Sequence, residues 1–163
     1  MKFFLLISII AGAVFLYSSI NQKNSFRDTN LSEESSAIWM TQLSEARAMA
    51  KNEGKPILMD FTGSNWCGWC VKLKKEVFTK PSFLGFANDN LILMTVDFPR
   101  GVHQEEWLVD QNNKLLDQYG VNSFPTIILT DYNGNLLGRT GYKSGGSENY
   151  VEHLKGLLSN SDN

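Results

Sequence analysis

The sequence predicts an α/β fold, with a central mixed β-sheet of about four to five strands flanked by helices on both faces. Short apolar runs typical of buried strands alternate with segments of helical periodicity. The last two of these runs are separated by a hairpin turn. The resulting order is helix, strand, helix, strand, helix, strand, strand, helix, in a chain of single-domain size.

An N-terminal apolar export helix is expected to precede this fold, within residues 1–20. Lys2 is followed by an apolar run at residues 3–17, as in an export signal. Residues 11–13 (Ala-Gly-Ala) would suit signal peptidase, which would make this a cleaved signal peptide. Left uncleaved, the apolar segment would span roughly 27 Å, enough for a signal anchor in the inner membrane. A buried core helix is disfavoured because the segment is terminal and apolar all round.

The chain after the export segment divides into three parts. Residues 21–36 are polar with few apolar anchors and are interpreted as a linker. Residues 37–159 carry the periodic pattern of the folded domain, and residues 160–163 form a tail. We therefore expect an exported domain, located in the periplasm or another extracytoplasmic compartment, that contacts the membrane only through a possible N-terminal anchor.

The elements of the domain follow from local signals. A first amphipathic helix is expected to end at Gly54 and Pro56, before an apolar strand at residues 57–61. Its inward positions are Trp39, Leu43, Ala46 and Ala50, with Ser44 as its cap; Trp39 fits core or edge packing. The later elements are helices at 68–77, 79–87, 104–119 and 150–158 and strands at 91–96, 127–129 and 136–139. The helix at 104–119 is expected to turn Trp107, Leu108, Leu115 and Leu116 inward and to end at Gly120, and residues 131–134 form the hairpin turn.

Cys67 and Cys70 are the only cysteines, and they lie where a strand ends and a helix begins. Helix N-termini stabilise thiolates, so Cys67 is the expected nucleophile and Cys70 the resolving thiol. A disulfide that closes four residues stabilises a fold by only about 2 kcal/mol in the chain-entropy model, which makes it a weak structural staple. An inert bridge remains an alternative. A zinc half-site is disfavoured because the two histidines, His103 and His153, lack ligand spacing.

Composition restricts the other functions. Fifteen basic and seventeen acidic residues give a net charge of −2, without a dense basic run, so nucleic acid is not an expected partner. No metal or organic cofactor is implied. The basic residues that follow the dithiol are most simply a solvated helix face, with thiolate stabilisation as the alternative: Lys72, Lys74 and Lys75.

Together, Asp60, the segment Trp-Cys-Gly-Trp-Cys at 66–70 and the later Phe-Pro-Thr at 124–126 resemble the thioredoxin superfamily. The likeness covers roughly residues 39–158. It is greatest to exported bacterial thioredoxin-like proteins similar to the C-terminal domain of the membrane thiol:disulfide interchange protein. This resemblance implies a thioredoxin-like fold and dithiol–disulfide exchange.

The resemblance also implies roles for residues around the dithiol. The Phe124–Pro125 bond would be cis and face the cysteines, so that the backbone of Phe124 pairs with a client strand. A trans proline that begins a strand is the alternative. Asp60 would relay the proton of Cys70, although six residues separate Asp60 from Cys67, one more than in ordinary thioredoxin.

Two tryptophans and the dipeptide between the cysteines complete the expected site. Trp66 and Trp69 would form an apolar rim for clients, and Trp66 has packing as an equal alternative. Gly68 and Trp69 place no histidine between the cysteines, which favours reduction over oxidation.

The expected function is therefore an exported thiol:disulfide oxidoreductase that reduces client proteins with disulfides. A membrane-bound or soluble thiol partner would supply its electrons. The alternatives are a disulfide isomerase or oxidase, and a peptide-binding module that keeps the fold without turnover.

Overall fold

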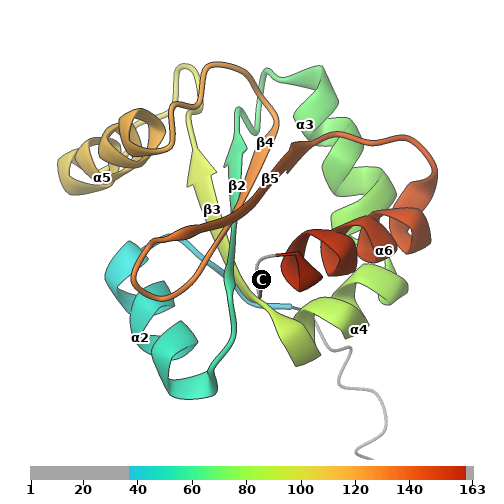
Figure 1. The fold of residues 1–163 in the computed structure, drawn as a ribbon. Coiled ribbons are helices and arrows are strands. Elements are labelled where there is room, and N and C mark those ends of the chain that lie inside the picture. Colours follow the sequence, from blue (N-terminus) through green and yellow to red (C-terminus); the bar gives the residue numbers. More distant parts are fainter. Residues whose placement is uncertain (1–36, 161–163) are drawn as a thin grey trace, which may run out of the picture. The chain divides into compact units, whose positions relative to one another are not determined.

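The computed structural model describes residues 37–160, which form a mixed five-stranded sheet with helices on both faces (Figure 1). The strand order is β1-β3-β2-β4-β5. The first three strands in that order are parallel, whereas β4 runs antiparallel to β2 and β5 antiparallel to β4. The predicted fold class is confirmed. The strands are β1 (Trp39–Met40), β2 (Ile57–Thr62), β3 (Ile92–Asp97), β4 (Thr126–Thr130) and β5 (Leu136–Gly141).

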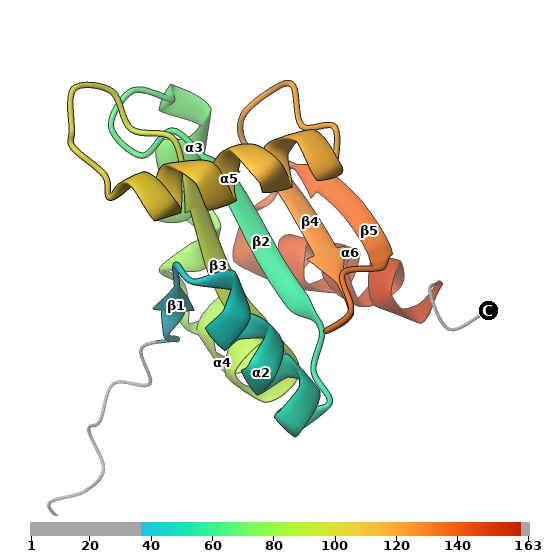
Figure 2. The ribbon, with the colours of Figure 1, turned by 90° about the vertical axis from the view of Figure 1, so that its left-hand side faces the viewer.

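The helices form two layers, one on each face of the sheet (Figures 1 and 2). One layer consists of α2 and α5, and the other of α3, η1, α4 and α6, where η1 is a π-helical turn that continues α3. Their bounds are α2 (Leu43–Glu53), α3 (Gly68–Leu73), η1 (Lys74–Phe78), α4 (Pro81–Asn90), α5 (Glu106–Gln118) and α6 (Gly146–Ser159).

Side chains that alternate along β2 divide the core in two. Leu58 belongs to the cluster beneath α3, α4 and α6, and its neighbours Ile57 and Met59 belong to the cluster beneath α2 and α5. Successive strand residues point to opposite faces, so Asp60 lies on the same face as Leu58. The acid is thus on the side of the sheet that carries the helix with the cysteines.

The expected start of the first helix was wrong. Trp39 lies in β1, which pairs in parallel with β3, and its ring packs 5.0 Å from Phe78 and 6.4 Å from Phe83 between centroids. Helical spacing is a local signal, and here pairing with a strand some fifty residues away prevails over it. Gln42 occupies the N-cap position, without a side-chain capping bond, and Ser44 lies inside the helix; the expected end at Gly54, with φ of 66°, is confirmed.

The inward face of α5 was also predicted incorrectly in one position, because Trp107 is 50% exposed. The buried stripe runs through Asn112 and Leu115, with Leu108 half-buried one turn before them. Asn112 is a polar core residue whose Nδ2 donates to the carbonyl of Asp97 at 3.0 Å. A search for apolar periodicity passes over such a residue, because the hydrogen bond that allows its burial is not local.

The helices after the cysteines lie where expected but differ at their ends, since α4 continues to Asn90 and α6 begins at Gly146, four residues before the expected start. Pro81 begins α4, a position where a missing N–H costs no helical hydrogen bond. Within residues 37–160, no helix combines the length and apolarity needed to cross a bilayer. The expected export helix at 1–20, the whole linker at 21–36 and residues 161–163 of the tail lie outside the described residues.

Candidate functional site

The two cysteines lie at the start of α3 and are joined in a disulfide, with their Cα atoms 5.2 Å apart. Cys67 is the N-cap of the helix, and its Sγ accepts a hydrogen bond from the backbone N–H of Cys70 at 3.2 Å. Cys67 is 7% exposed and Cys70 5% exposed, so the two differ little in burial in the oxidised state. A thiolate on Cys67 would keep this N–H donor and gain from the helix dipole.

Trp66 is held on one side of the disulfide by its own indole N–H. Nε1 donates to the carbonyl of Phe98 at 2.7 Å, and the guanidinium of Arg100 lies 3.9 Å from the ring centroid. The ring also covers Gly63, where an added Cβ would collide with the indole carbons. Gly63 is therefore required by the close approach of this ring.

The loop between β2 and α3 is hydrogen-bonded to the loop after β3. The backbone N–H and the hydroxyl of Ser64 donate to the two carboxylate oxygens of Asp97 at 2.9 and 2.6 Å. Asn65 donates from Nδ2 to the carbonyl of Arg100 at 2.8 Å and accepts from the N–H of Arg100 at 3.0 Å. These hydrogen bonds fix the backbone of the six-residue segment between Asp60 and Cys67.

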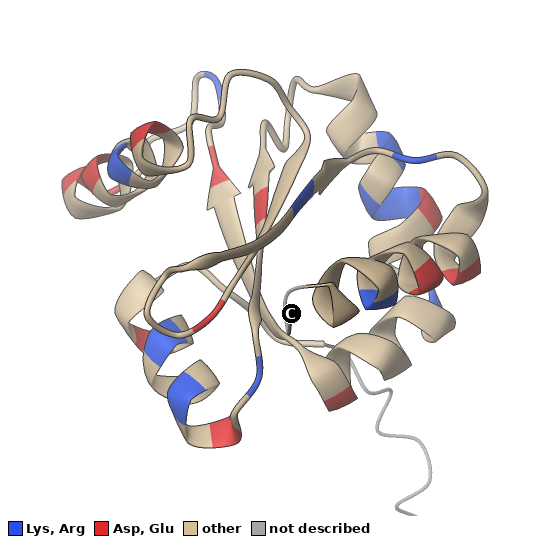
Figure 3. Cartoon of the chain, viewed as in Figure 1, with Lys and Arg blue, Asp and Glu red and all other residues tan. Residues whose placement is uncertain are grey.

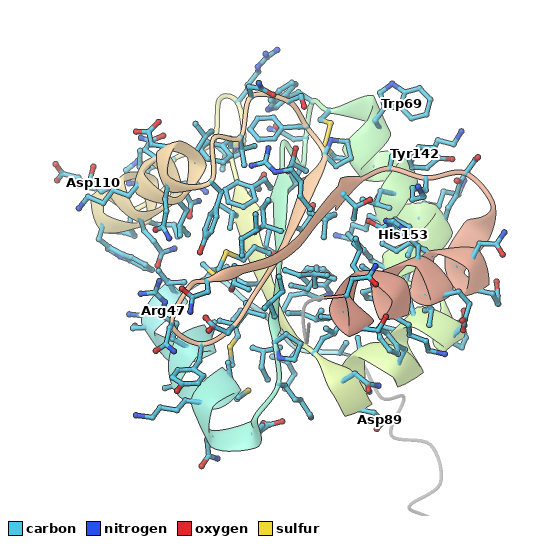
Figure 4. All side chains as sticks on the ribbon, in the orientation of Figure 1. Arg47, Trp69, Asp89, Asp110, Tyr142 and His153 are labelled. Carbon is cyan, nitrogen blue, oxygen red and sulfur yellow. A yellow bond between two sulfur atoms is a disulfide. The ribbon has the colours of Figure 1, made fainter. Side chains whose placement is uncertain are left out.

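Trp69, between the cysteines, packs on the other side of the disulfide. Its ring lies 5.1 Å from that of Tyr142 between centroids and is 57% exposed (Figure 4). The Nζ of Lys72 lies 5.1 Å from both ring centroids, and the Tyr142 hydroxyl donates to Oε2 of Glu76 at 2.7 Å. The hydroxyl and the ammonium thus tie the strand end at Tyr142 to the helix that carries the cysteines.

The Phe124–Pro125 peptide bond is cis, and both residues are half-buried. The ring of Phe124 lies 5.9 Å from Trp66 and 5.2 Å from Phe98 between centroids. The structure therefore brings Phe124 and Trp66 together, from segments more than fifty residues apart in the chain. Pairing of the Phe124 backbone with a client strand stays a prediction.

Asp60 is a buried acid on the face of the sheet beneath α3. Burial raises the pKa of Asp60 to about 7; the carboxylate of Asp97 adds to the rise, and the Lys74 ammonium opposes it. Its Oδ1 has no hydrogen-bond partner among residues 37–160. Burial also raises the pKa of Tyr150, with a further contribution from the charge of Asp60. A carboxyl that titrates near neutral pH is suited to proton transfer, although its relay role toward Cys70 stays a prediction.

The two histidines do not join this site. The Nε2 of His153 lies 2.9 Å from the Thr140 hydroxyl, and burial lowers the pKa of His153. His103 is exposed in the loop before α5. In the part of the chain from 37 to 160, no three His, Cys, Asp or Glu side chains gather in a way that could hold a metal ion.

Several residues that surround the disulfide in the structure were not predicted from the sequence to belong to the site. Arg100 and Tyr142 come from loops, and only the folded chain brings them to the two tryptophans. Asp97 could have been found, because it ends the strand next to β2 and charged groups at neighbouring strand ends meet at one sheet edge. Lys74 was taken for a solvated residue, and it is exposed, yet its charge acts on Asp60.

A model of the thioredoxin-like domain family matches residues 43–155. Among curated proteins, the disulfide bond reductase DsbH of Chlamydia pneumoniae is 39% identical over 114 residues, which cover 70% of this chain and 69% of that protein. The thioredoxin-related protein DsbJ of the same organism is 28% identical over 109 residues, or 67% of this chain, and the match spans 31% of its length.

Solved structures give the same result. A structure described as a DsbH oxidoreductase has a TM-score of 0.71 and 34% identity, covering 81% of this chain and 93% of that chain. A thioredoxin from Thermus thermophilus has a TM-score of 0.58 at 16% identity, and the match covers 77% of this chain and 90% of that chain. This likeness supports the fold alone.

Proposed function

This chain belongs to the thioredoxin-like family, as a thiol:disulfide oxidoreductase, and we propose that it is exported and reduces the disulfides of client proteins. The observation that carries the proposal is the Cys67–Cys70 disulfide at the N-terminus of α3. Similarity to a protein named a disulfide bond reductase supports this direction of exchange. The missing histidine between the cysteines favours it too.

The reaction needs only the two thiols. The Cys67 thiolate attacks one sulfur of a client disulfide, which forms a mixed disulfide and releases the other client sulfur as a thiolate. Cys70, deprotonated, then attacks Sγ of Cys67, which frees the second client thiol and leaves the protein in the disulfide form described above. Two electrons pass to the client, and a membrane-bound or soluble dithiol partner must restore them.

Asp60 is the proposed proton acceptor for Cys70. With a pKa of about 7, its carboxyl can exchange a proton at neutral pH, unlike an ordinary aspartate. Its position under α3, on the face of Leu58, supports the assignment. The proton would otherwise have to leave Cys70, which is 5% exposed, directly to solvent.

Client binding is proposed for the surface on both sides of the disulfide. Trp66 and Trp69 expose apolar ring surface there, and the ring of Phe124, the residue before Pro125, lies next to Trp66. The proline lacks an N–H, so the backbone of Phe124 remains the polar group through which an extended client could pair. We propose export through residues 1–20, with 21–36 as linker, 37–159 as the catalytic domain and 160–163 as tail. A compartment outside the cytosol, such as the periplasm, lets the disulfides of client proteins persist.

A trapping experiment separates this enzyme from a binding module. In Cys70→Ala, the mixed disulfide on Cys67 cannot be resolved, so the full-length protein should accumulate client adducts. These adducts should be visible on non-reducing gels and should disappear when the sample is treated with dithiothreitol. The matched control is the Cys67→Ala/Cys70→Ala double variant, which keeps the aromatic surface and should trap none. Equal recovery of clients with both variants would favour binding without exchange.

The reduction potential of the Cys67–Cys70 couple tests the direction. Equilibration with dithiothreitol or glutathione buffers, followed by thiol counting, should give a value near that of thioredoxin, about −270 mV. A value near −120 mV, as for a strong oxidant, would contradict the assignment as a reductase and favour the oxidase alternative.

A further inference from the structure

We propose that this site selects client cystines flanked by acidic residues, because a cation lies over the aromatic surface on each side of the disulfide. The inference rests on the proposed function and specifies its substrate class. On one side Arg100 lies over Trp66, and on the other Lys72 lies over Trp69 and Tyr142. An extended client passing over the cysteines would meet one cation before and one after its cystine.

Arg100 is fixed in place, and it has no anionic partner within the part of the chain that the structure describes. Its backbone is held by both polar atoms of the Asn65 side chain, and its guanidinium lies 3.9 Å from the Trp66 ring centroid. Among residues 37–160, no carboxylate lies within 4.0 Å of this guanidinium. Its planar set of N–H donors is therefore available to a carboxylate of another chain. A guanidinium can bind a carboxylate through two parallel hydrogen bonds, which is a favourable geometry.

Lys72 is placed in a similar way on the other side. Its Nζ lies 5.1 Å from the centroids of Trp69 and Tyr142, and its nearest carboxylate, Glu76, is 3.9 Å away. Glu76 already accepts a short hydrogen bond from the Tyr142 hydroxyl on its other oxygen. A lysine that is half-exposed, and paired only at the outer limit of an ion pair, can bind a further carboxylate at little cost.

Two acidic side chains near these cations, Asp97 and Glu76, already accept hydrogen bonds within the protein. Both oxygens of Asp97 accept from Ser64, and Glu76 accepts from Tyr142. Figure 3 shows basic residues on the segment of α3 and η1 and on the loop after β3, which leads to α5 and its acidic residues on the left of the view. The chain as a whole has a net charge of −2, so the positive charge that a client would meet here comes from individual side chains and not from the charge of the whole chain.

These charges predict selection by rate of encounter as well as by affinity. Attraction between opposite charges speeds the association of client and protein, and salt weakens this attraction by screening it. The tryptophan rings would in addition contact apolar side chains beside the client cysteine. The preference for acidic clients should therefore be largest at low ionic strength.

The experiment uses two synthetic peptides that contain the same intramolecular disulfide, flanked by glutamates in one and by lysines in the other. Each is mixed with the reduced full-length protein, and peptide thiols are counted over time at low salt and at high salt. The acidic peptide should be reduced faster, and Arg100→Gln or Lys72→Gln should each lower the ratio of the two rates by about two- to fivefold. Arg100→Lys should keep most of the preference, since it keeps the charge.

Lys51→Gln is the matched control, because Lys51 is an exposed cation in the last turn of α2, away from the cysteines (Figure 1). It should leave the ratio unchanged. Equal rates for the two peptides, or a ratio that survives in the Arg100→Gln/Lys72→Gln double variant, would overturn the inference while the reductase function stands. Failure to reduce either peptide would instead overturn the proposed function.

Discussion

Cys67→Ser should abolish the reduction of insulin disulfides, with a loss of turnover of at least about a thousandfold. A serine hydroxyl is not ionised at neutral pH, and its oxygen does not form the mixed disulfide that exchange requires. Insulin precipitation in the presence of dithiothreitol, measured against the uncatalysed rate, gives the result directly.

The variant should remain folded, which makes the loss interpretable. Serine is a favourable N-cap residue, so the start of α3 keeps a side-chain acceptor in place of the Cys67 sulfur. Loss of the short disulfide loop should cost about 2 kcal/mol, measurable by urea denaturation. Cys70→Ser is the matched comparison, because it leaves the attacking thiol and blocks only resolution. Turnover that survived in Cys67→Ser would contradict the assignment of the nucleophile.

Asp60→Asn should stabilise the oxidised protein at pH 8 by about 4 kcal/mol. The pKa of Asp60 is about 7 when folded and 3.8 in a model compound, a difference of about three units at 1.36 kcal/mol each. Between these values the folded state binds the proton that the unfolded state has released, so the stability of the wild type falls as pH rises from 4 to 7. The asparagine variant lacks this ionisation and should show no such fall.

The measurement is urea denaturation of both oxidised proteins at pH 4, 5.5, 7 and 8. The two should come close together near pH 4, where Asp60 is protonated in the folded state and only partly ionised in the unfolded state. Asp97→Asn provides a second variant, because it removes a charge that raises the pKa of Asp60 and should move the fall to lower pH. Parallel pH profiles for wild type and Asp60→Asn would show that Asp60 ionises normally. Two other titratable groups interact with Asp60. The charge of Lys74 lowers the pKa of Asp60, and the charge of Asp60 raises the pKa of Tyr150.

The features predicted correctly from the sequence depend on neighbours along the chain. The apolar run of β2, the glycine that ends α2 and the turn between β4 and β5 are local signals, and each lies where expected. Cys67 and Cys70 were identified as the site because only two residues separate them, at a strand-to-helix junction. Periodicity and turn chemistry contain this information without tertiary contacts.

The missed features depend on distant contacts. Trp39 pairs in a strand because β3 offers it a free edge, and Trp107 faces outward because buried Asn112 occupies the core stripe. Arg100 and Tyr142 reach the two tryptophans from other loops. Helical spacing cannot distinguish these outcomes, because the competing interactions involve segments far away in sequence.

The hydrogen bonds of Asn65 and Ser64 have a consequence for protein engineering. They join the loop before the cysteines to residues 97–100, so that the two loops make one unit although thirty-odd residues separate them. A chimera that grafted only the Trp-Cys-Gly-Trp-Cys segment onto another scaffold would leave behind the carboxylate and carbonyl partners that shape it. The smallest transplantable module therefore comprises both loops, and variation in one constrains variation in the other.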